Sequence, residues 1–193
     1  MKTESTFRNM ALALGTICLV CSLLLGVVYS VTKDPIAAAE VAKVNEAIAK
    51  VVPSFDNVPS EEVLQIDGCD VYVARKGGRP VGYAVKVFSS GFGGQIQMMV
   101  GFTAEGTIHN TSVISHSETP GLGAKIAQEG DQAAAPRAQI VGKNPASTKL
   151  SVKADGGDID AITASTITSR AFLKGVETAY GVFLKIERDE RKQ

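Results

Sequence analysis

The chain has 193 residues, 45% of them hydrophobic and 21% charged, which fits one globular domain with an appended segment. Its 20 basic and 20 acidic residues balance, so it lacks the basic field with which proteins bind nucleic acid, and no such partner is expected. Three cysteines do not make a disulfide framework; Cys18 and Cys21 lie in an apolar segment and are interpreted as small hydrophobic side chains.

The first expected element is a transmembrane helix at residues 10–31. These 22 residues carry no charge, and at about 1.5 Å per residue they cover the roughly 30 Å hydrocarbon core of a bilayer. A cleavable signal peptide, the alternative, has a shorter apolar stretch of about 7–15 residues that ends at a small-x-small cleavage site. The run leads instead into the polar residues 32–35, so an uncleaved anchor is predicted.

Charges before this helix predict its orientation. Lys2 and Arg8, offset in part by Glu4, favour a cytoplasmic location for residues 1–9 under the positive-inside rule. No second apolar run approaches the length of a membrane span. The chain is therefore expected to cross the cell inner (cytoplasmic) membrane once, with its C-terminal domain on the periplasmic side.

Residues 32–62 are expected to form a membrane-proximal helix and a linker. Between Pro35 and Pro53, apolar residues recur at intervals of three or four, which predicts an amphipathic helix bounded by the two prolines. The apolar stripe of this helix consists of Ile36, Val41, Val44, Ile48 and Val51 or Val52.

Residues 63–187 are expected to form a single α+β domain with antiparallel strands and flanking helices. Apolar residues alternate with small or polar ones in runs separated by glycine-rich turns, which indicates strands with one buried face. The runs are residues 71–73, 81–87, 96–102 and 107–115.

A loop-rich stretch and a helix complete the domain. Glycine and proline punctuate residues 116–160, and so long a loop-rich region is usually functional or poorly ordered. A helical period then begins at Ser169, with Thr168 or Ser169 as its N-cap. Residues 188–193 alternate in charge and are interpreted as a solvated tail. The expected buried stripe of the helix contains Phe172, Val176, Ala179, Tyr180 and Phe183.

Two short segments carry the candidate chemistry. The first, residues 118–123, reads Glu-Thr-Pro-Gly-Leu-Gly. Its proline and two glycines predict a tight turn where backbone can approach a flat ligand closely, although an ordinary turn has the same composition.

The second segment, residues 158–170, contains five hydroxyl side chains and leads into the last helix. Backbone N–H groups at a helix start lack intrahelical partners, and the helix dipole favours negative charge, so a phosphate is well placed there. A Ser/Thr-rich N-cap and a phosphorylation site are the alternatives.

Together the two segments resemble the FMN-binding domain family, found in the G subunit of the Rnf complex and the C subunit of the sodium-pumping NADH:quinone reductase. The flavinylation motif of this family is Asp-x-x-Ser/Thr-Gly-Ala/Ser-Thr. Residues 160–166 match it at every defined position except Ala164, where the family usually has Gly. Residues 91–94 and 118–123 resemble other blocks of the family in order and spacing. The chain length favours the Rnf G subunit over the Nqr C subunit.

The resemblance implies a cofactor and a way of attaching it. In this family a flavin transferase uses FAD, with magnesium, to attach FMN through a phosphoester to the last threonine of the motif, which is Thr166 here. Asp160, Thr163 and Ser165 would shape the segment for the transferase and hydrogen-bond the phosphate.

The first segment is the candidate contact for the flavin ring, with Leu122 as its apolar residue. Its candidate cofactor-binding residues are Glu118, Thr119, Gly121, Leu122 and Gly123. No metal ligand and no catalytic residue is assigned. The resemblance implies an electron-relay subunit that works with the other subunits of an Rnf-type membrane complex, coupling electron flow between ferredoxin and NAD to ion translocation. The alternatives are an Nqr C subunit and a membrane-anchored interaction domain without redox function.

Overall fold

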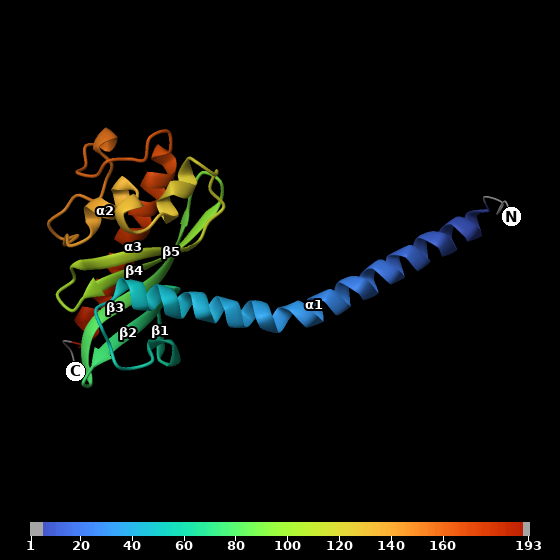
Figure 1. Cartoon of the computed structure of the whole chain (residues 1–193), viewed down its shortest axis with the longest axis horizontal. Helices are drawn as coiled ribbons and strands as arrows, with labels where there is room; N and C mark the ends of the chain where they lie inside the picture. Colours follow the sequence, from blue (N-terminus) through green and yellow to red (C-terminus); the bar gives the residue numbers. More distant parts are fainter. Residues whose placement is uncertain (1–5, 191–193) are drawn as a thin grey trace. The chain divides into compact units, whose positions relative to one another are not determined.

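The structure, a computed structural model, describes residues 6–190 (Figure 1). It divides into two units, Met1–Ala42 and Lys43–Gln193, and helix α1 (Phe7–Val51) runs from the first into the second. Part of the expected N-terminal segment, including Lys2 and Glu4, lies outside the described residues, as does the end of the charged tail.

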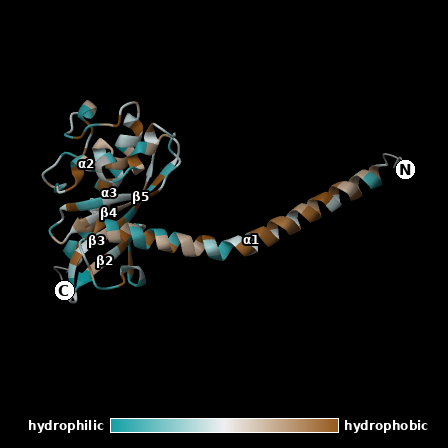
Figure 2. Ribbon diagram, viewed as in Figure 1, coloured by the Kyte–Doolittle hydropathy of each residue, from teal (hydrophilic) through white to brown (hydrophobic). Residues whose placement is uncertain are grey.

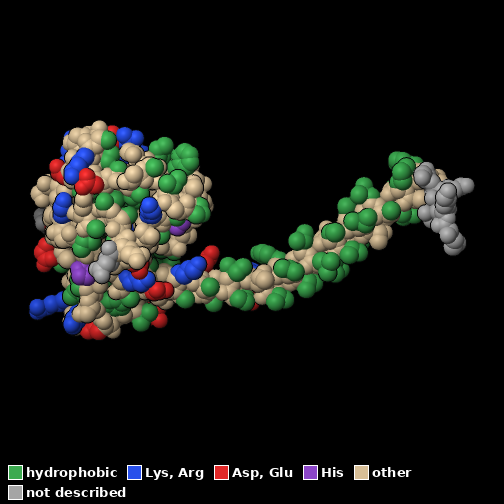
Figure 3. Space-filling view, turned by 45° about the horizontal axis from the view of Figure 1, so that its top comes forward, with side chains coloured by type: hydrophobic (Ala, Val, Ile, Leu, Met, Phe, Trp, Pro, Cys, Tyr) green, Lys and Arg blue, Asp and Glu red, His purple; other side chains and the backbone are tan. Residues whose placement is uncertain are grey.

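The first unit contains the apolar part of α1. Within residues 6–190, α1 is the one helix that is long and apolar enough to cross a membrane, which fits the expected span (Figure 2). Hydrophobic side chains cover this segment in the space-filling view (Figure 3). The hydroxyls of Thr16, Ser30 and Thr32 each donate to the carbonyl four residues earlier, at 2.8–2.9 Å. These bonds satisfy the hydroxyl protons within the helix, as an apolar environment requires.

The expected helix boundary at Pro35 is wrong, because α1 continues through this residue. Proline has no backbone N–H, so one intrahelical hydrogen bond is lost there while the helix on both sides persists. Ile36 and Val41, expected on a buried stripe, are more than half exposed. Burial begins further along, because α1 contacts the sheet only through its last turns, at Ala47, Ile48 and Val51.

The second unit is built on a five-stranded antiparallel sheet in which every strand pairs with the next along the chain. This arrangement confirms the α+β class. The strands are β1 (Val63–Ile66), β2 (Cys69–Lys76), β3 (Arg79–Ser90), β4 (Gln95–Thr103) and β5 (Ile108–Ser115).

Strands β2 to β5 agree with the expected runs, and β1 was not predicted. Its residues are largely exposed, so they lack the alternation on which strand prediction depends. Gly77 and Gly78 connect β2 and β3 with φ values of 58° and 79°. A two-residue turn with positive φ at both positions matches the right-handed twist of the flanking strands.

Both faces of the central strands are buried, which corrects the expectation of one buried face. Helix α3 (Thr166–Glu190) covers one face, and the last turns of α1 cover the other, over Tyr72, Ala84 and Met99. A Cβ at Gly101 would lie 1.8 Å from the carbonyl oxygen of Val51. Strand β4 therefore needs glycine at this position for α1 to pack on the sheet.

Helix α3 begins at Thr166, three residues before the expected start. Thr168 and Ser169 therefore lie in its first turn, and the expected N-cap is wrong. The predicted stripe is confirmed at Phe172, Val176, Ala179 and Phe183, which are buried against the sheet, while Tyr180 is half-buried.

Short helices order much of the loop-rich region. They are η2 (Gly123–Ala127), η3 (Gly130–Gln132), α2 (Ala135–Ile140) and η4 (Lys153–Asp155); η1 (Pro59–Glu61) precedes the sheet. Arg137 of α2 is buried and donates to the carbonyl oxygens of Thr111 in β5 and of Gln128, the latter at 2.6 Å. Burial lowers the pKa of Arg137. This guanidinium thus connects the loop region to the edge of the sheet.

We predict that Phe183→Ala strongly destabilises the second unit. The ring is 3% exposed and lies 5.3 Å from Phe102 and 5.6 Å from Tyr83, centroid to centroid. Truncating a buried Phe typically lowers the free energy of unfolding by about 3–5 kcal/mol. Urea unfolding of the chain in detergent measures the loss. Thr178→Ala, on the exposed face of the same helix, should change stability by less than about 0.5 kcal/mol; equal effects of the two substitutions would contradict the placement of α3.

Candidate functional site

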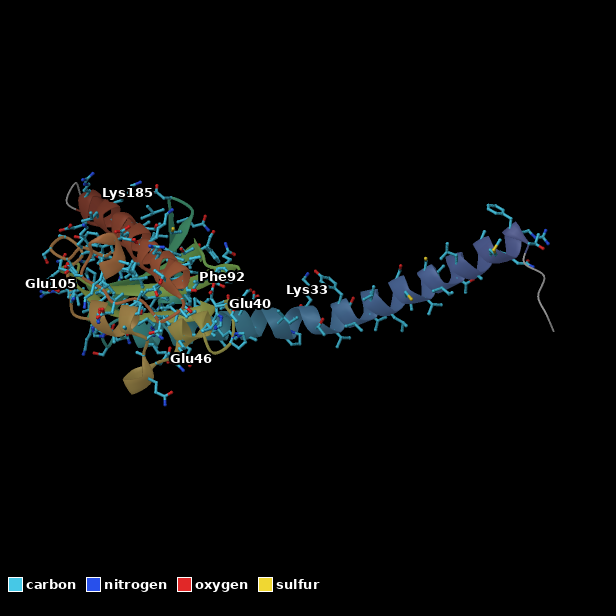
Figure 4. All side chains as sticks on the ribbon, turned by 90° about the horizontal axis from the view of Figure 1, so that it is seen from above. Lys33, Glu40, Glu46, Phe92, Glu105 and Lys185 are labelled. Carbon is cyan, nitrogen blue, oxygen red and sulfur yellow. The ribbon has the colours of Figure 1, made fainter. Side chains whose placement is uncertain are left out.

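The two segments singled out in the sequence meet at one cleft of about 450 Å³, here called the α3 cleft. Its walls come from the β3–β4 connection, the Glu118–Gly123 turn and the start of α3. Phe92 of the first wall is labelled in Figure 4. The lining residues are Phe92, Glu118, Thr119, Leu122, Gly123, Ala164, Ser165, Thr166, Ile167 and Thr168.

Glu118 connects the three walls of the cleft. Its side chain is 5% exposed. One carboxylate oxygen, Oε2, accepts a hydrogen bond from the Thr168 hydroxyl at 2.5 Å, and Oε1 accepts one from the backbone N–H of Gly93 at 3.1 Å. Both oxygens of a buried carboxylate are thereby satisfied, as burial requires.

Glycines make room for this carboxylate. A Cβ at Gly91 would lie 2.1 Å from Oε1 of Glu118, and a Cβ at Gly123 would lie 2.3 Å from Oε2. Glycine at these two positions therefore allows the Glu118 carboxylate to approach the backbone closely. Gly121 is exposed with φ of 76°, and a Cβ there would meet nothing within 4 Å, so its glycine serves the turn conformation.

The hydroxyl side chains around the start of α3 differ in accessibility. Ser165, Thr168 and Ser169 are buried, at 7%, 1% and 0% exposure. Ser169 is bonded on both sides, because its hydroxyl donates to the carbonyl of Ser165 at 3.0 Å and accepts the N–H of Ile162 at 2.9 Å. Thr166 is half-buried, lines the α3 cleft and is the first residue of the helix.

Three of the nine candidate residues do not line the α3 cleft. Thr163 is exposed and lines a separate cavity beside α2, and Gly121 lies on the outside of its turn. Asp160 forms an ion pair with Lys153 at 2.8 Å and accepts a hydrogen bond from the Gln139 amide at 2.6 Å. These bonds, that of Lys153 first, lower the pKa of Asp160. The carboxylate is thus already engaged on the outer surface of the segment.

Four lining residues were not among the candidates: Phe92, Ala164, Ile167 and Thr168. The sequence carried a weak signal for two of them. Phe92 stands among glycines, and Ile167 is an apolar residue within a hydroxyl-rich helix start. Thr168 was interpreted as a cap, and its contact with Glu118, 50 residues away along the chain, has no sequence signal.

Ala164 has a left-handed backbone conformation, with φ of 59°. This is the position at which the family usually has Gly. A residue with a Cβ is strained by roughly 1–2 kcal/mol in this conformation, whereas glycine is not. The turn before α3 therefore carries local strain in this chain.

Glu118 is the only charged residue that lines the α3 cleft in the described part of the chain. Arg170 and Lys174 line a neighbouring cavity of about 380 Å³, which shares Ile167 with the α3 cleft. Arg170 is paired with Asp155 through two hydrogen bonds of 2.7 Å, and this pairing lowers the pKa of Asp155. Neither Arg170 nor Lys174 lines the α3 cleft itself.

The donor set of the α3 cleft fits FMN. At one end, the first turn of α3 offers a hydroxyl and N–H groups without intrahelical acceptors, which suit a phosphate without a cation. At the mouth, Phe92, Leu122 and Ile167 are 70%, 42% and 51% exposed and suit an apolar ring. The residues that would hold the phosphate and the ring thus lie in one cleft.

Comparisons with known proteins match both units. The FMN-binding domain family model matches residues 91–181, and the model of the RnfG N-terminal region matches residues 1–51. Among solved structures, the C subunit of a Na(+)-translocating NADH-quinone reductase from Parabacteroides distasonis aligns over 71% of this chain and 78% of its own. That alignment has 21% identity and a TM-score of 0.43, too low to identify a fold.

Curated relatives cover most of the chain. The G subunit of an ion-translocating oxidoreductase complex of Cereibacter sphaeroides is 32% identical over 89% of this chain and 82% of its own length. The G subunit of the proton-translocating ferredoxin:NAD(+) oxidoreductase complex of Clostridium ljungdahlii is 32% identical over 84% of this chain and 83% of its own. The G subunit of the Na(+)-translocating ferredoxin:NAD(+) oxidoreductase complex of Acetobacterium woodii is 30% identical over 93% of this chain and 93% of its own length. The chain belongs to the family of G subunits of ion-translocating oxidoreductase complexes.

Proposed function

We propose that this chain is an electron-relay subunit of an Rnf-type membrane complex and carries FMN in the α3 cleft, linked through a phosphoester to Thr166. The relatives are named as subunits of complexes that translocate ions, two of them with ferredoxin and NAD(+) as redox partners. The observation that supports the proposal best is the meeting of the two flavin-family segments in one cleft, with Thr166 half-buried in its wall.

The bound flavin would accept and pass on electrons, and the chain would supply position and electrostatics. Thr166 would fix the phosphate end at the start of α3. Phe92, Leu122 and Ile167, from three different segments, would contact the ring at the mouth of the cleft. These contacts would orient the ring relative to α3 and the sheet.

Attachment would exchange one phosphorus–oxygen bond for another without any redox change. The Thr166 hydroxyl oxygen would attack the phosphorus of the FMN half of FAD, the bond to the AMP half would break, and AMP would leave. The hydroxyl proton would pass to a base on the transferase or to water. Among the hydroxyls at the start of α3 that line the cleft, Ser165 and Thr168 are buried, which favours Thr166 over these two as the nucleophile.

Orientation and partners belong to the same proposal. Arg8 and Lys2 before the apolar segment favour a cytoplasmic N-terminus, so the flavin domain would lie on the periplasmic side. A covalent link suits that side, because no cytoplasmic flavin pool could replace a lost cofactor there. The other subunits of the complex and a flavin transferase are the expected partners.

The Nqr C subunit remains the closest alternative, since it shares the flavin motif. The match of residues 1–51 to the RnfG N-terminal region favours the Rnf assignment. The other alternative, a non-redox interaction domain, assigns no role to the α3 cleft or to the Thr166 hydroxyl in its wall.

The proposal predicts that Thr166→Ala abolishes covalent flavin while the domain still folds, because the substitution removes the oxygen that forms the ester. Mass spectrometry of tryptic peptides from a host with the transferase should find the mass of FMN minus water on Thr166 in the wild-type chain. Thr178→Ala is the matched control, since it removes an exposed hydroxyl further along the same helix that lies outside the α3 cleft and outside the motif. Flavin retained by Thr166→Ala would contradict the assigned site.

Ala164→Gly should raise stability, because glycine adopts the left-handed conformation of this position without strain. After subtraction of the backbone entropy that glycine loses on folding, the expected gain is up to about 1 kcal/mol. Thermal unfolding of the flavin-free chain measures it. Ala138→Gly, at an exposed position inside α2, should instead destabilise by about 0.5–1 kcal/mol. Equal losses in both variants would show that Ala164 is not strained.

The topology predicts activity of a reporter fused after Gln193. Alkaline phosphatase folds only outside the cytoplasm, so the fusion should be active if the domain is periplasmic. A cytoplasmic reporter at the same position should be inactive. The reverse pattern would overturn both the orientation and the location of the flavin.

A further inference from the structure

The carboxylate of Glu118 is buried in the wall of the α3 cleft and has no cationic partner among residues 6–190. No Lys or Arg nitrogen in the described part of the chain lies within 4.0 Å of it. The hydrogen bonds of its side chain come from a hydroxyl and a backbone N–H, and the N–H of Gly93 can only donate. Oε1 is therefore an acceptor, and Oε2 lies at 2.5 Å from a hydroxyl that can donate to it. Both hydrogen bonds are thus ones that a carboxylate oxygen can accept.

Neutral alternatives would fill this position at lower cost. A charge is expensive to bury, and a buried charge without an opposite charge is rarer than a buried amide of the same shape. Two glycines, at 91 and 123, are also required to accommodate the carboxylate oxygens. Holding the three walls together explains the hydrogen bonds, but the charge requires a separate explanation.

We propose that Glu118 is a positioning residue that joins the walls of the flavin site and whose negative charge lowers the redox potential of the flavin. The inference rests on the proposed function. Adding electrons to the flavin increases negative charge in the cleft, and a fixed anion in its wall opposes that change. Coulomb interactions are strong there because the group is removed from water, and Glu118 is the only charge that the described lining presents.

The hydrogen bonds and the charge can be separated by substitution. Glu118→Gln keeps the size of the side chain and an acceptor oxygen for Gly93 while removing the charge. Thr168→Val keeps the charge and the shape of residue 168 but removes the hydroxyl that Oε2 accepts from. Glu105→Gln removes a carboxylate from the exposed turn after β4, at the opposite end of this strand from Phe92 (Figure 4).

The experiment uses the full chain in detergent, purified from a host with the flavin transferase. Absorbance after denaturation gives the covalent flavin per chain, and spectroelectrochemical titration gives the midpoint potential. Glu118→Gln should favour reduced flavin at least tenfold, which is an upward shift of about 30 mV for a two-electron couple. Glu105→Gln should leave the potential unchanged. Thr168→Val should lower the thermal midpoint of the chain without raising the potential. The charge of Glu118 remains in this variant, while its carboxylate has lost a hydrogen-bond donor.

Several outcomes would overturn the inference. A potential that shifts no more in Glu118→Gln than in Glu105→Gln would show that the charge does not act on the flavin. If Glu118→Gln failed to retain flavin, Thr168→Val would decide: a raised potential in that variant contradicts the role of the charge, and an unchanged or lower one supports it. Absence of covalent flavin from the wild-type chain would overturn the proposed function as well, whereas an unchanged potential with flavin in place would overturn this inference alone.

Discussion

The hydrogen bonds of Glu118 to Thr168 and Gly93 join three segments that are distant in the sequence. They attach the β3–β4 connection and the start of α3 to one carboxylate of the 118–123 turn. Each segment accommodates the carboxylate in its own way, through glycine in the first two and through a hydroxyl in the third. The position of Thr166 follows, because it lies on the same helical turn as Thr168.

The rest of the domain keeps α3 fixed relative to that carboxylate. Helix α3 packs its apolar stripe on one face of the sheet, and the last turns of α1 cover the other face. A helix packed on a sheet over this length places its first turn within narrow limits, since interiors are close-packed and tolerate little shift. Gly101 and Gly175 allow the close approach on the two faces: a Cβ at Gly175 would lie 2.6 Å from the methyl carbon of Met98. The cleft thus depends on the packing of both helices.

Much of this architecture could be predicted from the sequence. Alternating apolar residues predicted four of the five strands, and helical periodicity predicted the stripe of α3, because both patterns come from burial against one core. The exposed strand β1 and the continuation of α1 through Pro35 could not be predicted, since the first has no burial pattern and the second contradicts the usual effect of proline. The burial of the sheet on both faces could not be predicted either, because it depends on the tertiary packing of the last turns of α1 against the strands. For the site, residue types and their spacing indicated the two segments, but the contact of Glu118 with Thr168 is a product of tertiary structure.

The central claim is that the α3 cleft holds FMN through a covalent bond. Fluorescence of the wild-type band on a denaturing gel tests it most directly, because only a covalently bound flavin remains with a denatured chain. The account predicts a fluorescent band when the chain is made together with a flavin transferase, and a dark band when the transferase is absent. A dark band in both cases would contradict it, as would a flavin that binds the folded chain but is lost on denaturation.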